Sequence, residues 1–363
     1  ISVSALLSAL LAFVLACSPQ GPPAPVPATP TVAPPSAAAP APISGDTDWQ
    51  KVEQAARTEG RLVVYDATFF AGDLGRAVTK AFKEKYGITV EFLVTGGSAA
   101  SIERLQTEKR MGQAVASLSA TGSVSGPRVV TLGLVQSMSQ ELPVLKDRSA
   151  FSMDPLYSPG GELLTFTYTP FAAAVNTNMV KEGEIQSFYD LLDPKWKGKM
   201  VMRDPRLGSG AEMLTITTMR YEKILDDDYF YKLAQQKPVL WGGSSQEAGR
   251  MVARGEPPIG FYTSVTSIYA PIIKEGGPLK VVHFKEGSIG MPATIQLVKG
   301  APHPNAARLF ANWLLSAEGQ RVYCETGAIP SIRKDVPDFA LPELKMDAVK
   351  KLIPTSWEVA LKT

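Results

Sequence analysis

The sequence predicts an α/β protein built from two similar units. A continuous apolar run, Leu62–Tyr65, is typical of a strand buried on both faces of a sheet. A helical stripe and a second strand at Thr89–Val94 follow it, so we expect the two strands to be parallel neighbours. The order of strand, glycine–serine loop and helix recurs at Met200–Glu212 and Val239–Glu247. The recurrence predicts a second α/β domain rather than one extended sheet.

Composition is that of an ordinary globular protein. The chain has 363 residues, enough for two domains with cores of their own, and 45% of its residues are hydrophobic. Lys and Arg number 37 against 35 Asp and Glu, a formal net charge of +2. So small a net charge supplies no strong field to attract DNA or RNA, and we expect no nucleic-acid partner.

The N-terminal region is typical of an exported protein. Val3–Ala16 is apolar but too short for a resident membrane helix, and it suits the apolar region of a secretory signal. Because the chain starts at Ile1 without a methionine or a basic leader, we expect a few residues to precede it. Residues 18–45 are rich in Pro and Ala without apolar periodicity, which predicts a disordered tether.

Cys17 closes the apolar run. Val14-Leu15-Ala16-Cys17 resembles a bacterial lipoprotein signal, in which the cysteine receives lipid after cleavage. We therefore predict a signal peptide at residues 1–17 and an acylated Cys17 that holds the protein at the outer face of the cytoplasmic membrane. The alternative is a buried cysteine in an ordinary signal. With Cys324 as the other cysteine, no disulfide framework is expected.

The first unit continues as alternating helices and strands. Asp73 begins a helix with one apolar stripe, which Gly87 ends. Gly96-Gly97-Ser98 bends the chain, and Ser98 is expected to cap the next helix. Further predicted elements are a helix at Lys51–Thr58 and a third strand at Val115–Leu118, with Ser119–Ser123 as its exit loop. Val129–Leu145 fits helix or strand equally.

The second unit shows two helix openings. Ser209 with Glu212 and Ser244 with Glu247 have the spacing of a capping box. The other expected elements are strands at Thr165–Val175, Met200–Met202, Pro258–Tyr262, Leu279–Phe284 and Pro292–Val298, and helices at Phe188–Leu192 and Ala306–Leu315.

With these elements in order, the sequence resembles the extracellular solute-binding proteins of bacterial ABC importers, in the group containing ferric-ion binders and binders of small organic anions. The stretches that carry the resemblance are Glu59–Tyr65, Phe82–Val90, Leu191–Lys199 and Ala306–Gln320.

The resemblance implies a two-lobe, periplasmic-binding-protein-like fold of type II. Each lobe would be a mixed, mainly parallel sheet flanked by helices, joined by hinge strands near Thr167–Val175 and Gly287–Thr294. Lobe one would comprise residues 46–168 and 292–363, including the C-terminal helices, and lobe two residues 169–291. A monomer would capture a small anionic ligand in the cleft and deliver it to the ABC permease, without catalysis and without a cofactor.

The candidate ligand contacts are helix openings, where unpaired N–H groups and the helix dipole suit carboxylate, phosphate or sulfonate. Plain helix capping is the alternative for each opening. The residues concerned are Gly97, Ser98 and Ala99 in lobe one, and Gly208, Ser209, Gly210, Ser244 and Ser245 in lobe two.

Further candidates are side chains at strand exits. Arg206 could pair an anion through its guanidinium fork, or be occupied by Asp204. Thr68, Phe69 and Tyr262 could supply a hydroxyl or a ring, although Tyr262 could equally belong to the core.

Iron is the alternative ligand. In the ferric branch of the family, adjacent tyrosines of lobe two supply phenolate oxygens. Here the corresponding stretch has no Tyr-Tyr pair, and Tyr262 and Tyr269 are too far apart to reproduce that motif directly. We therefore predict no metal site and favour a small organic anion, with ferric iron bound by Tyr262 and Tyr269 as the alternative.

Enzyme signatures are absent from the sequence. His283 and His303 have no partner at ligand spacing, and Gly122–Gly126 has Val124 where a nucleophile elbow needs serine. No phosphate-binding P-loop or dinucleotide glycine pattern occurs. An extracytoplasmic hydrolase or a structural lipoprotein are the alternatives of another class.

Overall fold

The computed structural model describes residues 46–152, 156–206, 211–340, 342 and 352–355. All of them belong to one compact unit, Ala39–Thr363. The predicted signal peptide, tether and Cys17 lie outside the described residues. So do Gly208, Ser209 and Gly210.

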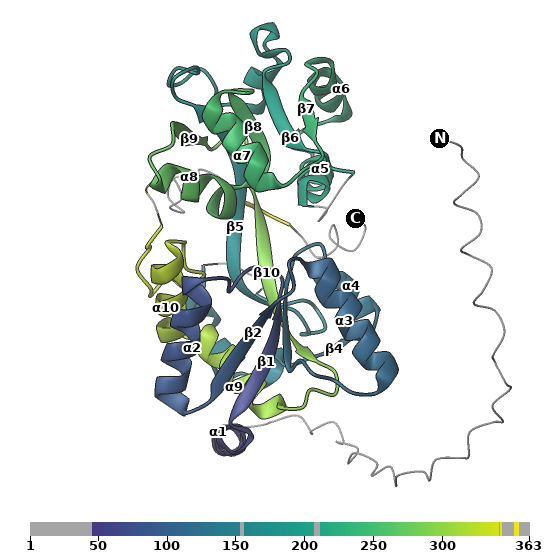
Figure 1. The fold of residues 1–363 in the computed structure, drawn as a ribbon, viewed down its shortest axis with the longest axis vertical. Coiled ribbons are helices and arrows are strands. Elements are labelled where there is room, and N and C mark those ends of the chain that lie inside the picture. The colour runs from purple at the N-terminus through teal and green to yellow at the C-terminus, as the bar shows by residue number, and fades with distance from the viewer. Residues whose placement is uncertain (1–45, 153–155, 207–210, 341, 343–351, 356–363) are drawn as a thin grey trace, which may run out of the picture. The chain divides into compact units, whose positions relative to one another are not determined.

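The opening strand–helix–strand unit forms as the apolar pattern predicts. Strands β1 (Arg61–Asp66) and β2 (Thr89–Val94) are parallel, with Arg61 opposite Thr89, and β3 (Leu118–Gly122) pairs in parallel with β1 on its other side. Figure 1 shows β1 and β2 side by side. The helices of this part are α1 (Asp46–Glu59), α2 (Asp73–Tyr86), α3 (Ser98–Met111) and α4 (Gly126–Thr131).

Strand β3 lies further along the chain than expected, so the predicted strand Val115–Leu118 and exit loop Ser119–Ser123 are wrong. Its small polar residues are buried between β1 and β10. The Thr121 hydroxyl has a partner there, because Gln296 donates to it from Nε2 over 2.9 Å. The region left open between helix and strand holds a short strand, β4 (Val135–Gln136), and two 3-10 turns.

Two long strands connect the halves of the sheet. β5 (Leu164–Asn176) and β10 (Ser288–Val298) pair antiparallel, with Phe171 opposite Ile289 at one end and Leu164 opposite Ile295 at the other. The hydrogen-bonded order is β2-β1-β3-β10-β5-β8-β6-β7. The expectation of separate sheets is therefore corrected: β5 and β10 are long enough to pair with strands of both units, which makes the hydrogen bonding continuous.

In the second half of the sheet, β5 is buried on both faces. Successive side chains of a strand point to opposite faces, and Ala173 and Val175 of β5 pack in one core cluster while Ala172 and Ala174 pack in another. The strands here are β6 (Met200–Arg203), β7 (Val239–Trp241), β8 (Ile259–Ser264), β9 (Leu279–Val282) and β11 (Leu352–Pro354), and the helices are α5 (Ala211–Tyr221), α6 (Asp227–Gln235), α7 (Ser245–Arg254) and α8 (Ala270–Lys274).

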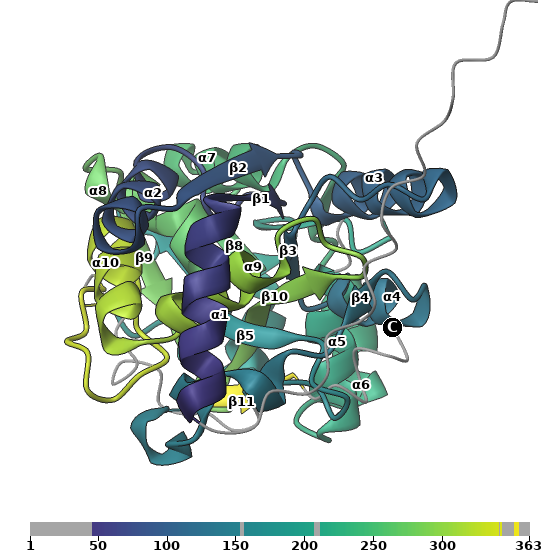
Figure 2. The same cartoon turned by 90° about the horizontal axis from the view of Figure 1, so that it is seen from below.

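The first half has a core of its own, rich in aromatic rings. Phe70 stacks on Phe92 with ring centroids 4.4 Å apart, and Phe310 contacts Phe70, Phe82 and Trp313. Two helices after β10, α9 (Pro304–Leu314) and α10 (Ala317–Gly327), complete this half, with α9 beside α1 and α10 beside α2 (Figure 2). The two-lobe fold is thus built on two sets of apolar residues with the crossing strands between them.

Phe310 offers a test of the first core. Phe310→Ala should lower the free energy of unfolding by about 3–5 kcal/mol, because a fully buried ring is replaced by a cavity. Urea unfolding followed by circular dichroism measures the change. Met111→Ala is the control, since Met111 is 71% exposed and should cost less than about 0.5 kcal/mol. Equal losses in the two variants would contradict this packing.

Candidate functional site

A cleft of about 400 Å³ lies where the loops of the first lobe meet the crossing strands. The β1–α2 loop, the start of α3 and the β3–α4 loop line one side, and β5, β8 and β10 line the other. Its described lining residues are Ala67, Thr68, Phe69, Leu74, Gly97, Ser98, Gly122, Ser123, Val124, Ser125, Thr167, Thr169, Phe171, Ser264, Met291, Pro292, Ala293, Tyr323, Gly327 and Ile329.

Asp66 shapes the β1–α2 loop. Its buried carboxylate accepts the N–H groups of Phe69 (2.8 Å) and Phe70 (2.9 Å) at the end of β1. Burial raises the pKa of this carboxyl, although the N–H donors oppose that rise. The bonds fold the chain back on itself, and the predicted contacts Thr68 and Phe69 lie at the cleft as a result.

The start of α3 also borders the cleft. Gly97 precedes the helix with φ 154°, a backbone conformation that favours glycine. The prediction that Ser98 caps this helix is wrong, because no side chain caps it. The Ser98 hydroxyl instead accepts the Gly122 N–H at 3.3 Å and connects α3 to the end of β3. Gly97 and Ser98 line the cleft, whereas Ala99 is not among its described lining residues.

Sequence reasoning missed the β3–α4 loop as a contact. Ser123, Val124 and Ser125 line the cleft, and the Ser123 hydroxyl donates to Sδ of Met291 at 3.3 Å. The sequence indicates an exit loop that ends at Ser123 and a failed nucleophile motif at Gly122–Gly126, but no ligand contact. The signal that would have found it is its place after β3, because parallel strands carry their exit loops to one edge of the sheet.

Arg206 is occupied by its neighbour. Its guanidinium donates to Asp204 from Nε at 2.9 Å and from a terminal nitrogen at 2.6 Å, and its backbone N–H donates to the same carboxylate at 3.0 Å. These bonds lower the pKa of Asp204 to about 2. Arg206 is not among the described residues that line the cleft.

The second serine-rich helix opening serves its own helix. Ser244 caps α7 as expected, since its hydroxyl accepts the Glu247 N–H at 3.2 Å. Neither Ser244 nor Ser245 is among the described lining residues of the cleft. Capping alone accounts for this motif.

Tyr262 lies in the core rather than at the cleft. β8 contains a bulge opposite β5, where Ala172 faces Thr263 and Ala174 faces Gly260. Tyr262 occupies the extra position with φ 55°, and its ring packs into the core 2% exposed. Burial raises the pKa of its hydroxyl well above the ordinary value.

The alternative tyrosine pair is separated by the sheet. Tyr262 packs in the same cluster as Ala173, and Tyr269 in the cluster of Ala172 and Ala174, on the opposite face. One metal ion cannot contact both phenols in this arrangement. The described residues also hold no group of three or more His, Cys, Asp or Glu side chains suited to a metal.

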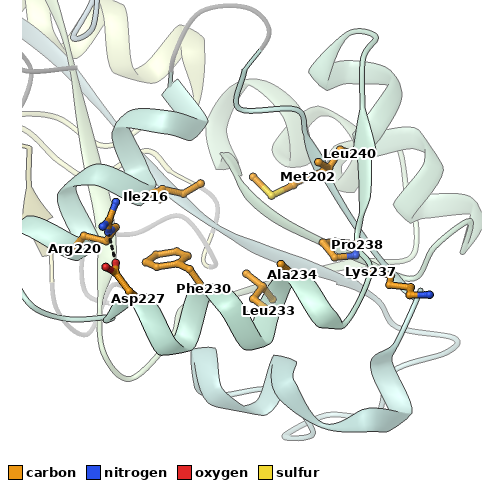
Figure 3. Close-up of a pocket in the computed structure, with 10 residues that line it drawn as sticks. All are labelled: Met202, Ile216, Arg220, Asp227, Phe230, Leu233, Ala234, Lys237, Pro238 and Leu240. Atoms are coloured by element: carbon orange, nitrogen blue, oxygen red, sulfur yellow. Dashed lines mark ion pairs between the residues drawn. The ribbon is translucent and has the colours of Figure 1, made fainter.

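A second hollow shares no described lining residue with the cleft and lies on the second lobe (Figure 3). This groove of about 490 Å³ runs between α5, α6 and β7. Apolar side chains such as Met202, Phe230 and Leu240 line it, and an ion pair of 2.7 Å between Arg220 and Asp227 lies at its edge.

Comparison with known proteins defines the class. The profile of the family described as bacterial extracellular solute-binding protein matches residues 77–351, more than half of the chain. The chain therefore belongs to this family of ABC-importer binding proteins. No helix in the described part of the chain combines the length and apolar character needed to cross a membrane.

The individual relatives share less than a third of their aligned residues with this chain. An uncharacterized protein of Haemophilus influenzae is 28% identical over 283 residues, 76% of this chain and 79% of its own length. A Salmonella typhimurium protein, named provisionally as a 2-aminoethylphosphonate-binding periplasmic protein, is 24% identical over 70% of this chain and 73% of its own.

Solved structures show the same fold. The periplasmic binding protein AfuA of Actinobacillus pleuropneumoniae with fructose-6-phosphate has a TM-score of 0.65 at 24% identity, covering 83% of this chain and 93% of its own. Iron-bound HitA of Pseudomonas aeruginosa has a TM-score of 0.67 at 21% identity, covering 83% and 94%. Both are periplasmic binding proteins of the two-lobe, type II architecture.

The pairing of Arg206 with Asp204 predicts a pH dependence. Because folding lowers the pKa of Asp204, the pair contributes to stability above the ordinary carboxyl range and loses that contribution as pH falls through about 2. In carbon NMR titrations, Asp204 should titrate near 2, and Arg206→Ala should return it toward 3.8. Arg250→Ala, at an exposed arginine of α7, should leave the titration unchanged. If Asp204 still titrates near 2 in the Arg206→Ala variant, the pairing is contradicted.

Proposed function

We propose that this protein is the substrate-binding lipoprotein of an ABC importer, and that it captures a small organic anion in the cleft for delivery to the permease. The observation that carries the proposal is the chemistry of the cleft lining. The hydroxyl-bearing residues Thr68, Ser98 and Ser125 line the cleft, and Ser98 is the first residue of α3. No Asp or Glu occurs among the described lining residues, so an anion would meet hydrogen-bond donors and no like charge there.

The donors at the cleft favour an organic anion over ferric iron. A hard cation such as Fe³⁺ needs anionic oxygen ligands. Tyr323 is the tyrosine among the described lining residues, and its hydroxyl donates to the Phe69 carbonyl at 3.3 Å. Burial raises the pKa of Tyr323 well above the ordinary value, which disfavours the phenolate.

Relatives with known or named ligands agree with this choice in part. The names of two of them refer to phosphorus-containing organic anions, 2-aminoethylphosphonate and fructose-6-phosphate, and that of a third to iron. We assign this chain to the organic-anion side because its own cleft offers neutral donors.

Delivery would follow from closure of the lobes. Residues from the first lobe and from the crossing strands both line the cleft, so a bound ligand can make contacts in a closed state that an open state lacks. Such differential contacts bias a hinge motion, and the closed form is what the permease would recognise. The protein binds its ligand without transforming it.

A thermal-shift screen of the full chain tests the ligand class. Small carboxylates, phosphonates, phosphate esters and sulfonates are compared with ferric salts. We expect one or more organic anions to stabilise the protein, by about 2.7 kcal/mol at 100 times the Kd. Ser125→Ala should weaken binding about 2- to 10-fold through the loss of one hydrogen bond. Ser149→Ala, at an exposed serine outside the described cleft lining, should leave binding unchanged.

Two results would contradict this function. Stabilisation by Fe(III) alone, with the visible colour of tyrosinate, would assign the protein to iron. Turnover of an ester that disappears with Ser123→Ala would make it a hydrolase.

Anchoring through Cys17 is a separate proposal. The sequence pattern at Val14–Cys17 supports it, and residues 18–45 would connect the anchor to the folded lobes. Expression in a bacterium fed a labelled fatty acid should label the native chain, and Cys17→Ala should remove the label. Cys324→Ala is the control, because that thiol is buried. A labelled Cys17→Ala variant would exclude this anchor.

A further inference from the structure

The cleft has a second kind of wall beside its hydroxyls. Phe69, Leu74, Phe171 and Ile329 line it with apolar side chains that are only partly buried, and Met291 adds its thioether. They come from the β1–α2 loop, α2, β5, the chain after α10, and β10. Separate elements thus bring apolar surface to one place, next to the polar openings of α3 and the β3–α4 loop.

The aromatic rings of this wall are held in place by the cores behind them. Phe69 packs edge-on against Phe166 with ring centroids 5.8 Å apart, and it belongs to the rim of the first core. Phe171 packs against the second-lobe core. Each ring therefore packs against the core of its lobe and also lines the cleft, which suits contact with a ligand.

The volume of the cleft also favours a ligand with apolar surface. About 400 Å³ corresponds to roughly 13 water molecules at their volume in the liquid. An inorganic oxyanion or a single metal ion would leave most of this volume to water held against phenylalanine and isoleucine. A ligand with a carbon skeleton would cover the apolar wall while its charged group met the hydroxyls.

We propose that the ligand is an amphiphilic organic anion, whose hydrocarbon segment lies between Phe69 and Phe171 and whose anionic group lies at Ser98 and Ser125. This inference rests on the proposed function and adds the requirement for an apolar segment. The site would distinguish organic anions from one another by the apolar surface area that each removes from water on binding.

Calorimetric titration of the full chain with homologous series tests this requirement. The probes are inorganic phosphate with methyl-, propyl- and hexylphosphonate, and acetate with butyrate and hexanoate. Affinity should rise about fourfold for each methylene that the wall covers. Phe171→Ala should flatten this dependence, because it removes one side of the wall.

Phe230→Ala is the matched control. Phe230 is also a partly buried phenylalanine that lines a hollow, but its hollow is the groove of Figure 3. The Phe230→Ala substitution should leave the dependence of affinity on the length of the ligand's hydrocarbon segment unchanged. Ile329→Ser serves as a second wall variant, on a different element, in case Phe171→Ala does not fold.

The outcomes separate this inference from the function on which it rests. If phosphate or acetate binds as tightly as its longest homologue, the requirement for a hydrocarbon segment is overturned and anion capture stands. The same conclusion follows if Phe230→Ala flattens the dependence as much as the wall variants do. If no anion in these series or in the thermal-shift screen binds, the proposed function itself fails.

Discussion

The antiparallel pairing of β5 with β10 is the constraint on which the rest of the structure depends. Both strands continue into both lobes, and together they contribute Thr167, Thr169, Phe171 and Met291–Ala293 to the cleft. The pairing leaves little room for substitution. A Cβ added at Gly290 would lie 1.5 Å from the Tyr168 hydroxyl oxygen, so the glycine accommodates the ring of the neighbouring strand.

Local pattern predicted much of the first lobe. The apolar run Leu62–Tyr65 and the stripe that follows Asp73 are sufficient for a parallel unit, because burial and helical periodicity decide both. β3 could not be placed in this way. Its small polar residues, Ser119 and Thr121, are typical of a loop, and the glutamine that donates to the Thr121 hydroxyl lies 175 residues further along the chain. The sequence leaves Tyr262 open between the cleft and the core for a related reason, since the bulge that turns its ring inward depends on the register with β5.

The candidate site was predicted in part. Thr68, Phe69, Gly97 and Ser98 lie together because parallel strands end at one sheet edge, which sequence order alone indicates. Ser244 shows the limit of the same reasoning: strand, serine and helix occur there too, yet the motif caps α7 outside the described cleft lining. Which helix openings face the cleft is decided by how the two lobes meet across β5 and β10, and no local pattern encodes that.

The cleft beside these crossing strands is the proposed ligand site. A crystal structure of the protein with its tightest-binding anion is the decisive experiment. We expect electron density for the ligand in contact with Gly97–Ser98 on one side and Phe171 on the other. A ligand bound in the groove around Phe230, with the cleft holding only water, would contradict it.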